Sequence, residues 1–479
     1  MARLTRRNFL KTSLAAGVGL TLAGPHSRVR GANDDIRMAV VGINGRGGSH
    51  ISEFRDIKGV RIVALCDVDR KVLEGKAKSF KDRNEQIDTY VDVRKLLENK
   101  NIDAISIATT NHSHSLITIW ACQAGKDVYV EKPCSHNVFE GRKCVEAARK
   151  YNRIVQHGTQ SRSSSGWAKQ IAAVHSGKYG KLLVSKGYCC KQRWSIGFKP
   201  IAEPPENLDF NLWLGPAPQQ PYHGNLVHYN WHWFWDFGNG DIGNQGVHQM
   251  DIARWAIKDA TLPKSVVSMG GRWVDEPDFK DQGQTPNQEL SVFDFDGTLL
   301  VFETRGLVDK KLKDKWPNKV DNEFYLEQGV IRDGKFYPNG KDTAEPLGDI
   351  EYHLNPGGNF ENFINCVRSR KREELNADIL EAHLSSALCH LGNISYRLGR
   401  QVPFDSQPKE FASNKMVSDS MMAVLENTKA IGVDPAKSTF CLGPVLKFDP
   451  AKEKFIDNPQ ADLLLTRPYR APFVVPEQV

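Results

Sequence analysis

A glycine-rich turn directly after a short apolar run constrains the fold of this chain more than any other feature. Residues 36–41 contain no turn former, and the next residues read Gly42-x-Asn44-x-x-Gly47. Gly42 permits a tight turn, Gly47 permits close approach of a following helix, and Asn44 tolerates the left-handed conformation. Because the amides and dipole at a helix start favour an anion, this turn predicts a strand–turn–helix unit that binds a pyrophosphate. The expected cofactor-binding residues of the turn are Gly42, Ile43, Asn44, Gly45, Arg46 and Gly47.

A second predicted strand, residues 60–66, ends on Asp67, which lies 25 residues after Gly42. A carboxylate at this position can accept hydrogen bonds from the ribose hydroxyls of NAD, and it repels the 2′-phosphate of NADP. Arg46 and Arg70 lie close enough in sequence to accommodate a phosphate. The sequence therefore favours NAD and leaves NADP possible.

Three further segments place chemically useful side chains after predicted elements. A strand over 102–108 leads into Thr109, Asn111 and His114, and an apolar run at 127–130 leads into Glu131-Lys132-Pro133. Further on, a glycine-rich stretch over 238–246 leads into His248 at the start of a predicted helix. Imidazole is a natural base near neutral pH, so His248 is a candidate for removing a hydroxyl proton.

Together these segments resemble the glucose-fructose oxidoreductase / inositol dehydrogenase / MocA family, over roughly residues 34–405. The resemblance implies an α/β fold: an N-terminal Rossmann domain, then a C-terminal α/β domain on an open, mostly antiparallel sheet. It also implies a nicotinamide cofactor, expected to be tightly bound, and a homo-oligomer.

The resemblance assigns roles to particular residues. The family lysine beside the nicotinamide and the reacting carbon matches Lys132, and its catalytic histidine matches His248. The usual family aspartate is Asn244 here, which can position a hydroxyl but cannot stabilise an imidazolium as a carboxylate would. The implied catalytic residues are Lys132, His248 and Asn244, and further cofactor contacts are Thr109, Asn111, His114 and Glu131.

Aromatic and polar residues crowd the stretch 223–235, between the two sets of motifs. A sugar offers apolar C–H faces and a rim of hydroxyls, which such residues suit. The histidine spacing matches no zinc pattern, so no metal is expected. The expected substrate residues are Gln160, Arg162, His232 and Asp251, with Asp251 either orienting His248 or binding a hydroxyl.

The formal charge of +7 does not indicate a nucleic-acid partner. Six basic residues and no acidic residue lie within residues 1–31, and without them the charge is +1. Residues 5–11, Thr-Arg-Arg-Asn-Phe-Leu-Lys, resemble a twin-arginine export signal, and the apolar stretch over 14–23 is too short for a good membrane span. We therefore expect the twin-arginine machinery as a partner, and the periplasm or another destination reached by that route. The nine cysteines form no C-x-x-C pair, which favours buried thiols over a disulfide framework.

These patterns divide the chain into an export segment (1–33), a Rossmann domain (34–158), a substrate and oligomerisation domain (159–405) and an irregular C-terminal extension (406–479). In the second domain we expect strands over 265–273, 289–295, 298–304 and 324–331, and helices over 359–370 and 377–398. The leading hypothesis is an exported NAD-dependent oxidoreductase acting on a sugar or polyol. The alternatives are a glycoside hydrolase that oxidises and re-reduces its substrate with bound NAD, and a carbohydrate-binding relative without catalysis.

Overall fold

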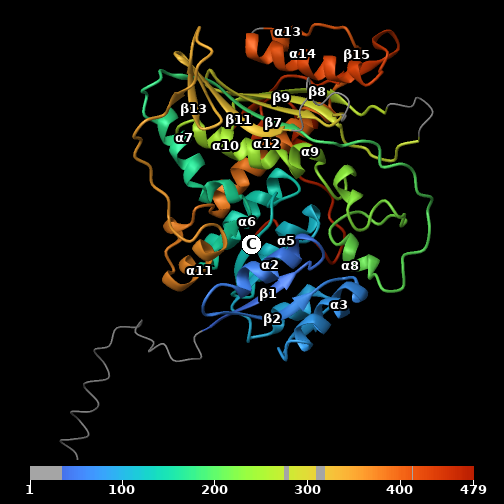
Figure 1. The fold of residues 1–479 in the computed structure, drawn as a ribbon. Coiled ribbons are helices and arrows are strands. Elements are labelled where there is room, and N and C mark those ends of the chain that lie inside the picture. Colours follow the sequence, from blue (N-terminus) through green and yellow to red (C-terminus); the bar gives the residue numbers. More distant parts are fainter. Residues whose placement is uncertain (1–34, 275–279, 309–318, 413) are drawn as a thin grey trace, which may run out of the picture.

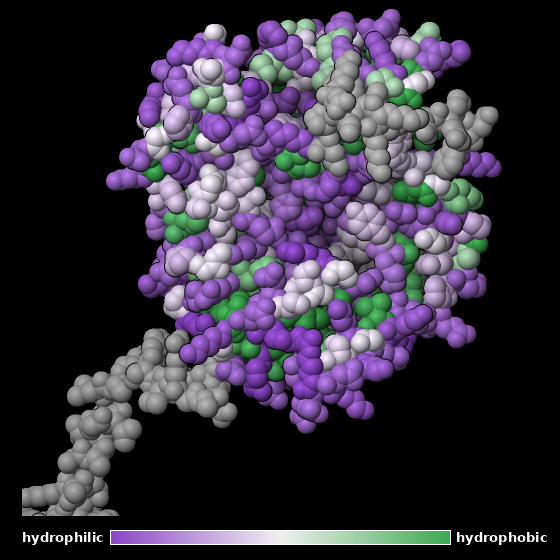
Figure 2. Space-filling view, viewed as in Figure 1, coloured by the Kyte–Doolittle hydropathy of each residue, from purple (hydrophilic) through white to green (hydrophobic). Residues whose placement is uncertain are grey.

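The computed structural model describes residues 35–274, 280–308, 319–412 and 414–479, and it stacks two β-sheets with helices between and around them (Figure 1). The export signal expected over 1–33 lies outside these residues. Within the described ranges, no helix has the length and apolar character needed to cross a membrane. The visible face is mostly hydrophilic, with apolar groups gathered toward the Rossmann half (Figure 2).

The first sheet is a six-stranded parallel sheet in the order β3-β2-β1-β4-β5-β6. Alternate residues of its central strand face opposite sides, so Ala39 and Val41 enter one apolar core while Met38 and Val40 enter the other. Its strands are β1 (Ile36–Val41), β2 (Val60–Cys66), β3 (Asp88–Tyr90), β4 (Ala104–Ile107), β5 (Asp127–Val130) and β6 (Val155–His157). Its helices are α2 (Arg46–Arg55), α3 (Arg70–Lys81), α4 (Val93–Glu98), α5 (Asn111–Gln123) and α6 (Val138–Lys150).

The register of this sheet brings the predicted motifs to one edge. A single row of paired residues crosses the sheet, and each strand ends at its member of that row. The turn residues Gly42, Asp67 and Glu131 are the next residues along three of these strands, so they emerge side by side. The row consists of Tyr90, Cys66, Val41, Ile107, Val130 and His157.

The second sheet is larger and mostly antiparallel, which confirms the expected fold class. Within the described residues it has 12 strands, and β7 and β10 form its parallel pair. The predicted strand over 324–331 is wrong in one respect, because Glu327 and Gln328 turn the chain and split it between two strands. The strands are β7 (Leu182–Cys190), β8 (Ser265–Gly271), β9 (Gln288–Phe295), β10 (Thr298–Arg305), β11 (Lys319–Leu326), β12 (Gly329–Arg332), β13 (Lys335–Pro338), β14 (Glu345–Pro346), β15 (Arg400–Pro403), β16 (Thr439–Leu442), β17 (Leu446–Asp449) and β18 (Lys454–Phe455).

Helices α10 (Gly246–Ala256) and α12 (Ile379–Arg397) pack between the two sheets. Phe293 and Phe302 of the second sheet meet them in one core, and α12 also contacts α6 of the Rossmann domain. Helix α10, which carries His248 in its first turn, is therefore packed on both sides. The remaining helices are α7 (Ser165–His175), α8 (Phe210–Leu214), α9 (Gly240–Asn244), α11 (Phe360–Ser369), α13 (Lys409–Ala412), α14 (Lys415–Ala430) and α15 (Pro459–Leu463), with 3₁₀ turns at Gln160–Ser163, Asn230–Trp233, Arg372–Glu374 and Pro435–Lys437.

The expectation of an irregular extension over 406–479 is wrong for its first half. Asn414 caps α14, and this helix places Val417, Met421 and Leu425 against the face of the second sheet that points away from the Rossmann domain. Strand β16 then joins the sheet between β8 and β15. The apolar spacing of four residues is a helical pattern that the proline-rich composition of the whole extension obscures. After α15 the chain is irregular and crosses to the Rossmann domain (Figure 1).

Candidate active site

A cavity of about 800 Å³ lies where the carboxyl edge of the first sheet meets the second domain. Its volume falls within the ordinary range for small-molecule sites, about 300–1,000 Å³. Most residues predicted from the sequence line it. They are Gly42, Asn44, Gly45, Arg46, Asp67, Thr109, Asn111, His114, Glu131, Lys132, Gln160, His232, Asn244 and His248.

The glycine turn has the shape of a phosphate cradle. A Cβ on Gly42, whose φ is 76°, would lie 2.8 Å from the backbone of Ala108, and a Cβ on Gly47 would lie 1.8 Å from the carbonyl oxygen of Gly42. Gly45 has a φ of 58°, so the positive φ in this part of the turn falls on Gly45 and not on Asn44. The amides of α2 begin directly after Gly45, which has no side chain to cap them, and this leaves room for an anion.

Ile43 and Gly47 stabilise the turn but do not line the cavity. Ile43 is fully buried, and its amide donates to Oδ2 of Asp67 at 2.9 Å. Gly47 packs against Gly42 as described above. Both residues shape the predicted cofactor turn through its backbone.

Three carboxylates meet at the ends of β2 and β3. Asp67 accepts from the amides of Ile43 and Asp69 at 2.9 and 3.0 Å, and burial raises the pKa of its carboxyl group. Asp69 caps α3 and lies 3.1 Å from Nε2 of His228, and Asp92 caps α4. Asp69 and Asp92 line the cavity but were not predicted. Their position after parallel strands was the available sign, since such strand ends meet at one edge.

Neither predicted phosphate-accommodating arginine is free beside these carboxylates. Nε of Arg46 donates to Oε1 of Glu131 at 2.7 Å, and Arg70 is exposed and absent from the cavity wall. Of the three carboxylates, Asp92 pairs with Arg94 at 2.6 Å and Asp69 lies 3.1 Å from His228, whereas Asp67 is held by backbone amides.

Glu131 and Lys132 directly follow β5, and both line the cavity. Burial alone would raise the pKa of the Glu131 carboxyl group, but His50, Arg46 and Lys132 hold that pKa well below its ordinary value. Nζ of Lys132 donates to the backbone oxygen of Asn244 at 2.7 Å, and burial lowers the pKa of this ammonium group. The lysine of the first domain thus touches the segment of the second domain that leads to His248.

His248 lies in the first turn of α10 and faces the same cavity. Burial, followed by the charge of Lys132, lowers the pKa of its imidazole to about 3, so the ring is neutral near pH 7. The side chain of Asn244 donates to Oδ1 of Asp241 at 3.4 Å, while its backbone contacts Lys132. Asp241 was not predicted; it is buried and pairs with Arg193 at 2.7 Å.

Two polar residues after β4 complete the cavity wall beside Lys132. The ring nitrogens of His114 lie 2.7 Å from the Pro133 oxygen and 3.0 Å from the Thr109 oxygen. Asn111 donates to Asn239 of the second domain at 3.3 Å. His114 therefore ties together the turns that bear Thr109 and Lys132.

The predicted substrate residues divide into two groups. Gln160 and His232 line the cavity, and the His232 ring stacks on Trp231 with centroids 3.6 Å apart. Arg162 and Asp251 do not line it. Instead, Nε of Arg162 donates to both carboxylate oxygens of Asp251 at 3.0 and 2.9 Å, deep in the protein.

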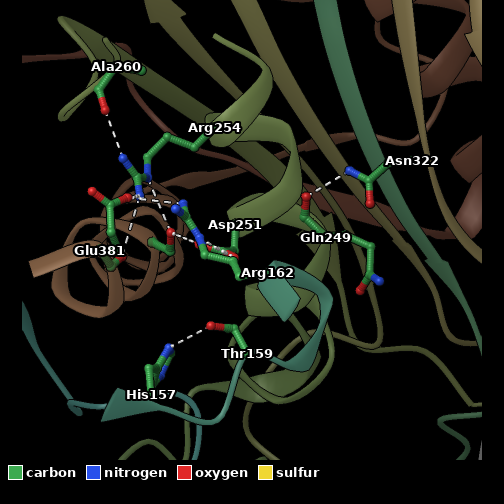
Figure 3. Close-up of polar contacts among 10 residues, drawn as sticks. His157, Thr159, Arg162, Gln249, Asp251, Arg254, Ala260, Asn322 and Glu381 are labelled. Atoms are coloured by element: carbon green, nitrogen blue, oxygen red, sulfur yellow. Dashed lines mark hydrogen bonds and ion pairs between the residues drawn. The ribbon is translucent and has the colours of Figure 1, made fainter. Parts of the chain in front are cut away.

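The prediction of Arg162 and Asp251 as substrate contacts is therefore not supported by their positions. Figure 3 shows them in a buried cluster with Glu381 and Arg254, on the side of α10 that packs against α12. Asp251 is held in this cluster by Arg162 and by the hydroxyl of Ser385, which donates to its Oδ1 at 2.6 Å. The described part of the chain contains no group of metal-ligating side chains.

Comparison with curated proteins finds partial relatives. A glycosyl hydrolase family 109 protein of Saccharopolyspora erythraea is 27% identical over 206 residues, which are 38% of this chain and 45% of that protein. An inositol 2-dehydrogenase of Salmonella paratyphi B is 27% identical over 155 residues, 32% of this chain and 45% of that protein. The chain thus matches about half the length of these relatives.

Comparison with solved structures and family models agrees on the fold. The WlbA dehydrogenase of Bordetella pertussis, solved with NADH and UDP-GlcNAcA, has a TM-score of 0.54 at 17% identity, covering 76% of this chain and 97% of that one. Residues 36–159 match the oxidoreductase family NAD-binding Rossmann fold, and residues 174–431 match the oxidoreductase family C-terminal alpha/beta domain. The chain therefore belongs to the glucose-fructose oxidoreductase / inositol dehydrogenase / MocA family.

Proposed function

We propose that this protein is an NAD-dependent oxidoreductase that transfers hydride between a carbinol carbon of a sugar or polyol and nicotinamide. One observation supports this proposal above the others: Lys132 of the first domain and His248 of the second line the same cavity as the dinucleotide turn. A substrate oxygen in that cavity would meet a proton donor and a proton acceptor from two separate domains.

The cavity suits both the pyrophosphate and the adenosine ribose of NAD. The Gly42 and Gly45 turn offers backbone amides to a pyrophosphate, and Asp67 retains free lone pairs for ribose hydroxyls. NAD, when bound, supplies the hydride acceptor. The protein's own side chains then have to bind the sugar, orient it and move one proton.

Lys132 and His248 divide that work. Because the His248 imidazole is neutral, it can accept the hydroxyl proton, but its low pKa makes it a weak base. The positive charge of Lys132 compensates, because it stabilises negative charge developing on the same oxygen. Asn244 has no carboxylate to stabilise a protonated histidine, and the charge of Lys132 disfavours that state, so Lys132 acts on the reacting oxygen and not on the imidazolium.

A carbohydrate is the proposed substrate class. Trp231 and His232 present a stacked aromatic pair to the cavity, and Gln160 adds an amide. Aromatic faces beside polar groups suit the C–H faces and hydroxyls of a sugar. The inositol dehydrogenase relative is consistent with this class.

The test is to denature the purified protein, identify the released nucleotide and follow hydride transfer by nicotinamide absorbance with a panel of sugars and polyols. We expect NAD or NADH in the released material and a single-turnover absorbance change with one subset of the panel. A protein that neither contains nor binds a nicotinamide nucleotide would contradict the proposal and would favour the carbohydrate-binding alternative.

A second candidate is a glycoside hydrolase that oxidises, eliminates, hydrates and re-reduces its substrate with the same NAD. The glycosyl hydrolase family 109 relative favours it. This candidate predicts release of free sugar from an aryl glycoside with no net change in NADH after many turnovers. A stoichiometric rise in NADH with a free sugar would assign simple dehydrogenation instead.

We also propose that the protein is exported by the twin-arginine route, on the basis of Arg6, Arg7 and the apolar stretch after them. Replacing both arginines by lysine should retain the protein in the cytoplasm, as measured by cell fractionation. Unchanged fractionation would contradict this proposal.

Asp67 should set the preference for NAD. In Asp67→Ala the affinity gap between NAD and NADP should narrow by about tenfold or more, because a like charge beside the 2′-phosphate is removed. Since Asp69 and Asp92 remain, the preference should shrink rather than reverse. Titration of both nucleotides measures this, with Asp82→Ala at the far end of α3 as the control. Equal affinities in the unaltered protein would contradict the assignment.

A further inference from the structure

A segment of the second domain lies along the length of the cavity. We name residues 205–237 the flap. Near the carboxylates, Leu208 pairs with Asp69 through a backbone bridge, and the amide of Arg70 donates to the oxygen of Asn207 at 2.8 Å. Further along, Trp231 and His232 line the part of the cavity that contains Lys132. The flap therefore covers both halves of the proposed dinucleotide site.

Next to the three carboxylates, the cavity wall becomes apolar. Val91 follows β3, Trp120 lies on α5, Leu212 and Trp213 belong to the flap, and Phe473 comes from the irregular end of the chain. A purine base attached to a ribose held at Asp67 would reach this apolar slot. Aromatic and aliphatic walls suit the flat face of a base.

Phe473 is a fixed part of this slot. Its side chain is buried, its ring lies 6.3 Å from that of Trp120, and the guanidinium groups of Arg94 and Arg470 lie 5.0 and 4.9 Å from its centroid. Cations at this distance from a ring are attracted to its face. Both arginines therefore contact this ring at the cavity wall.

Residues 465–475, which we name the strap, also fasten the flap from outside. Arg470 donates through Nε to the Gly215 oxygen at 3.1 Å and through its terminal nitrogens to the side chain and backbone oxygens of Asn211 at 2.6 and 2.7 Å. Arg467 donates to the Asp236 oxygen at 2.8 Å, near the other end of the flap. Figure 1 shows this last segment descending from the second sheet beside α8 and ending near α5 and α6.

We propose that the strap locks the flap over the adenosine half of the dinucleotide, with Phe473 forming part of the adenine slot, so that the cofactor stays bound between turnovers. This inference rests on the proposed function, since it requires a nicotinamide dinucleotide in the cavity. The whole strap lies beyond the residues matched by the family model, which end at 431. Release of the nucleotide would require the Arg470 and Arg467 contacts to break first.

The test compares the release of NADH from the unaltered protein, Arg470→Ala and Phe473→Ala, by following NADH fluorescence after a chase with excess NAD. We expect release to be at least about tenfold faster in each variant, the equivalent of losing one good contact. Arg332→Ala is the matched control, because Arg332 also stacks on an aromatic ring, at 4.2 Å from Tyr337, on the distant strand β12. The rate of NADH release from Arg470→Lys should lie between those of the unaltered protein and Arg470→Ala, because lysine keeps the positive charge but loses the forked set of N–H donors.

Binding of AMP alone separates the adenine slot from the rest of the site. Phe473→Ala should weaken AMP about as much as it weakens NADH, while Phe473→Leu, which keeps an apolar wall and guards against a folding defect, should retain most of the affinity. Unchanged AMP affinity in Phe473→Ala, or unchanged NADH release in Arg470→Ala, would overturn the inference and leave the proposed function intact. Failure of the unaltered protein to bind NADH at all would overturn both.

Discussion

Lys132→Ala should lower the single-turnover rate of hydride transfer by a factor of about 10² to 10⁴. The ammonium group stabilises charge on the reacting oxygen, and in the free protein its Nζ donates to the Asn244 oxygen at 2.7 Å, so it is already held at the boundary of the two domains. Nicotinamide absorbance with an active sugar measures the rate. Lys81→Ala, on the exposed end of α3, is the matched control and should leave the rate unchanged.

His248→Ala should cause a loss of similar size, and the double variant should lose much less than the product of the two, because groups that serve one transition state act as a unit. Nucleotide binding should survive, since His248 enters the cavity from the second domain. His175→Ala, at the exposed end of α7, is the control. An unchanged rate in Lys132→Ala would mean that the Glu131-Lys132-Pro133 tripeptide only supports the strand end.

Asp251→Asn should lower the free energy of unfolding by about 3–5 kcal/mol, the usual cost of leaving a buried charge uncompensated, because Glu381 alone would then face both Arg162 and Arg254. Arg162 donates to both oxygens of Asp251, Ser385 donates to one at 2.6 Å, and Asp251 itself is 1% exposed. Urea unfolding measures the change. The control is Asp419→Ala, which removes an exposed ion pair with Lys415 and should cost less than about 1 kcal/mol.

The same variant decides between the two readings of Asp251. If Asp251 is a buried anchor of α10, replacing it should lower the free energy of unfolding. The double variant Arg162→Met with Asp251→Leu should then recover part of the loss, because an apolar pair leaves neither charge unpaired. As a sugar ligand, its replacement would raise KM at unchanged stability. The second result would contradict the structural assignment.

Much of the first domain could be predicted because its pattern is local. A buried strand, a glycine turn and the start of a helix can be recognised within about twelve consecutive residues. The carboxyl ends of parallel strands in turn always lie at one edge of the sheet. That rule alone brings Gly42, Asp67 and Glu131 together, as the sheet register confirms. The same reasoning could have found Asp69 and Asp92, which follow the same strand ends.

The rest depends on contacts between distant segments, which a local pattern does not contain. Nothing near Asp251 in the sequence shows that Arg162 will draw its carboxylate toward α12 rather than toward the cavity. Phe473 lies 353 residues from Trp120, so only the folded chain brings it to the cavity wall. In the turn, the positive φ falls on Gly45, which has no Cβ to oppose it, and the tolerance of Asn44 for the left-handed conformation is not needed.

The nine cysteines are all buried, none is paired with another, and they are spread over both domains. Folding therefore requires no oxidant, and the native protein should be unreactive toward a thiol reagent such as Ellman's reagent. Each thiol becomes reactive only when its surroundings open. The unaltered chain thus contains its own set of probes: Cys66, Cys122 and Cys144 report on the first domain, while Cys189, Cys389 and Cys441 report on the second. The order in which these thiols are labelled in mild denaturant would show which domain opens first.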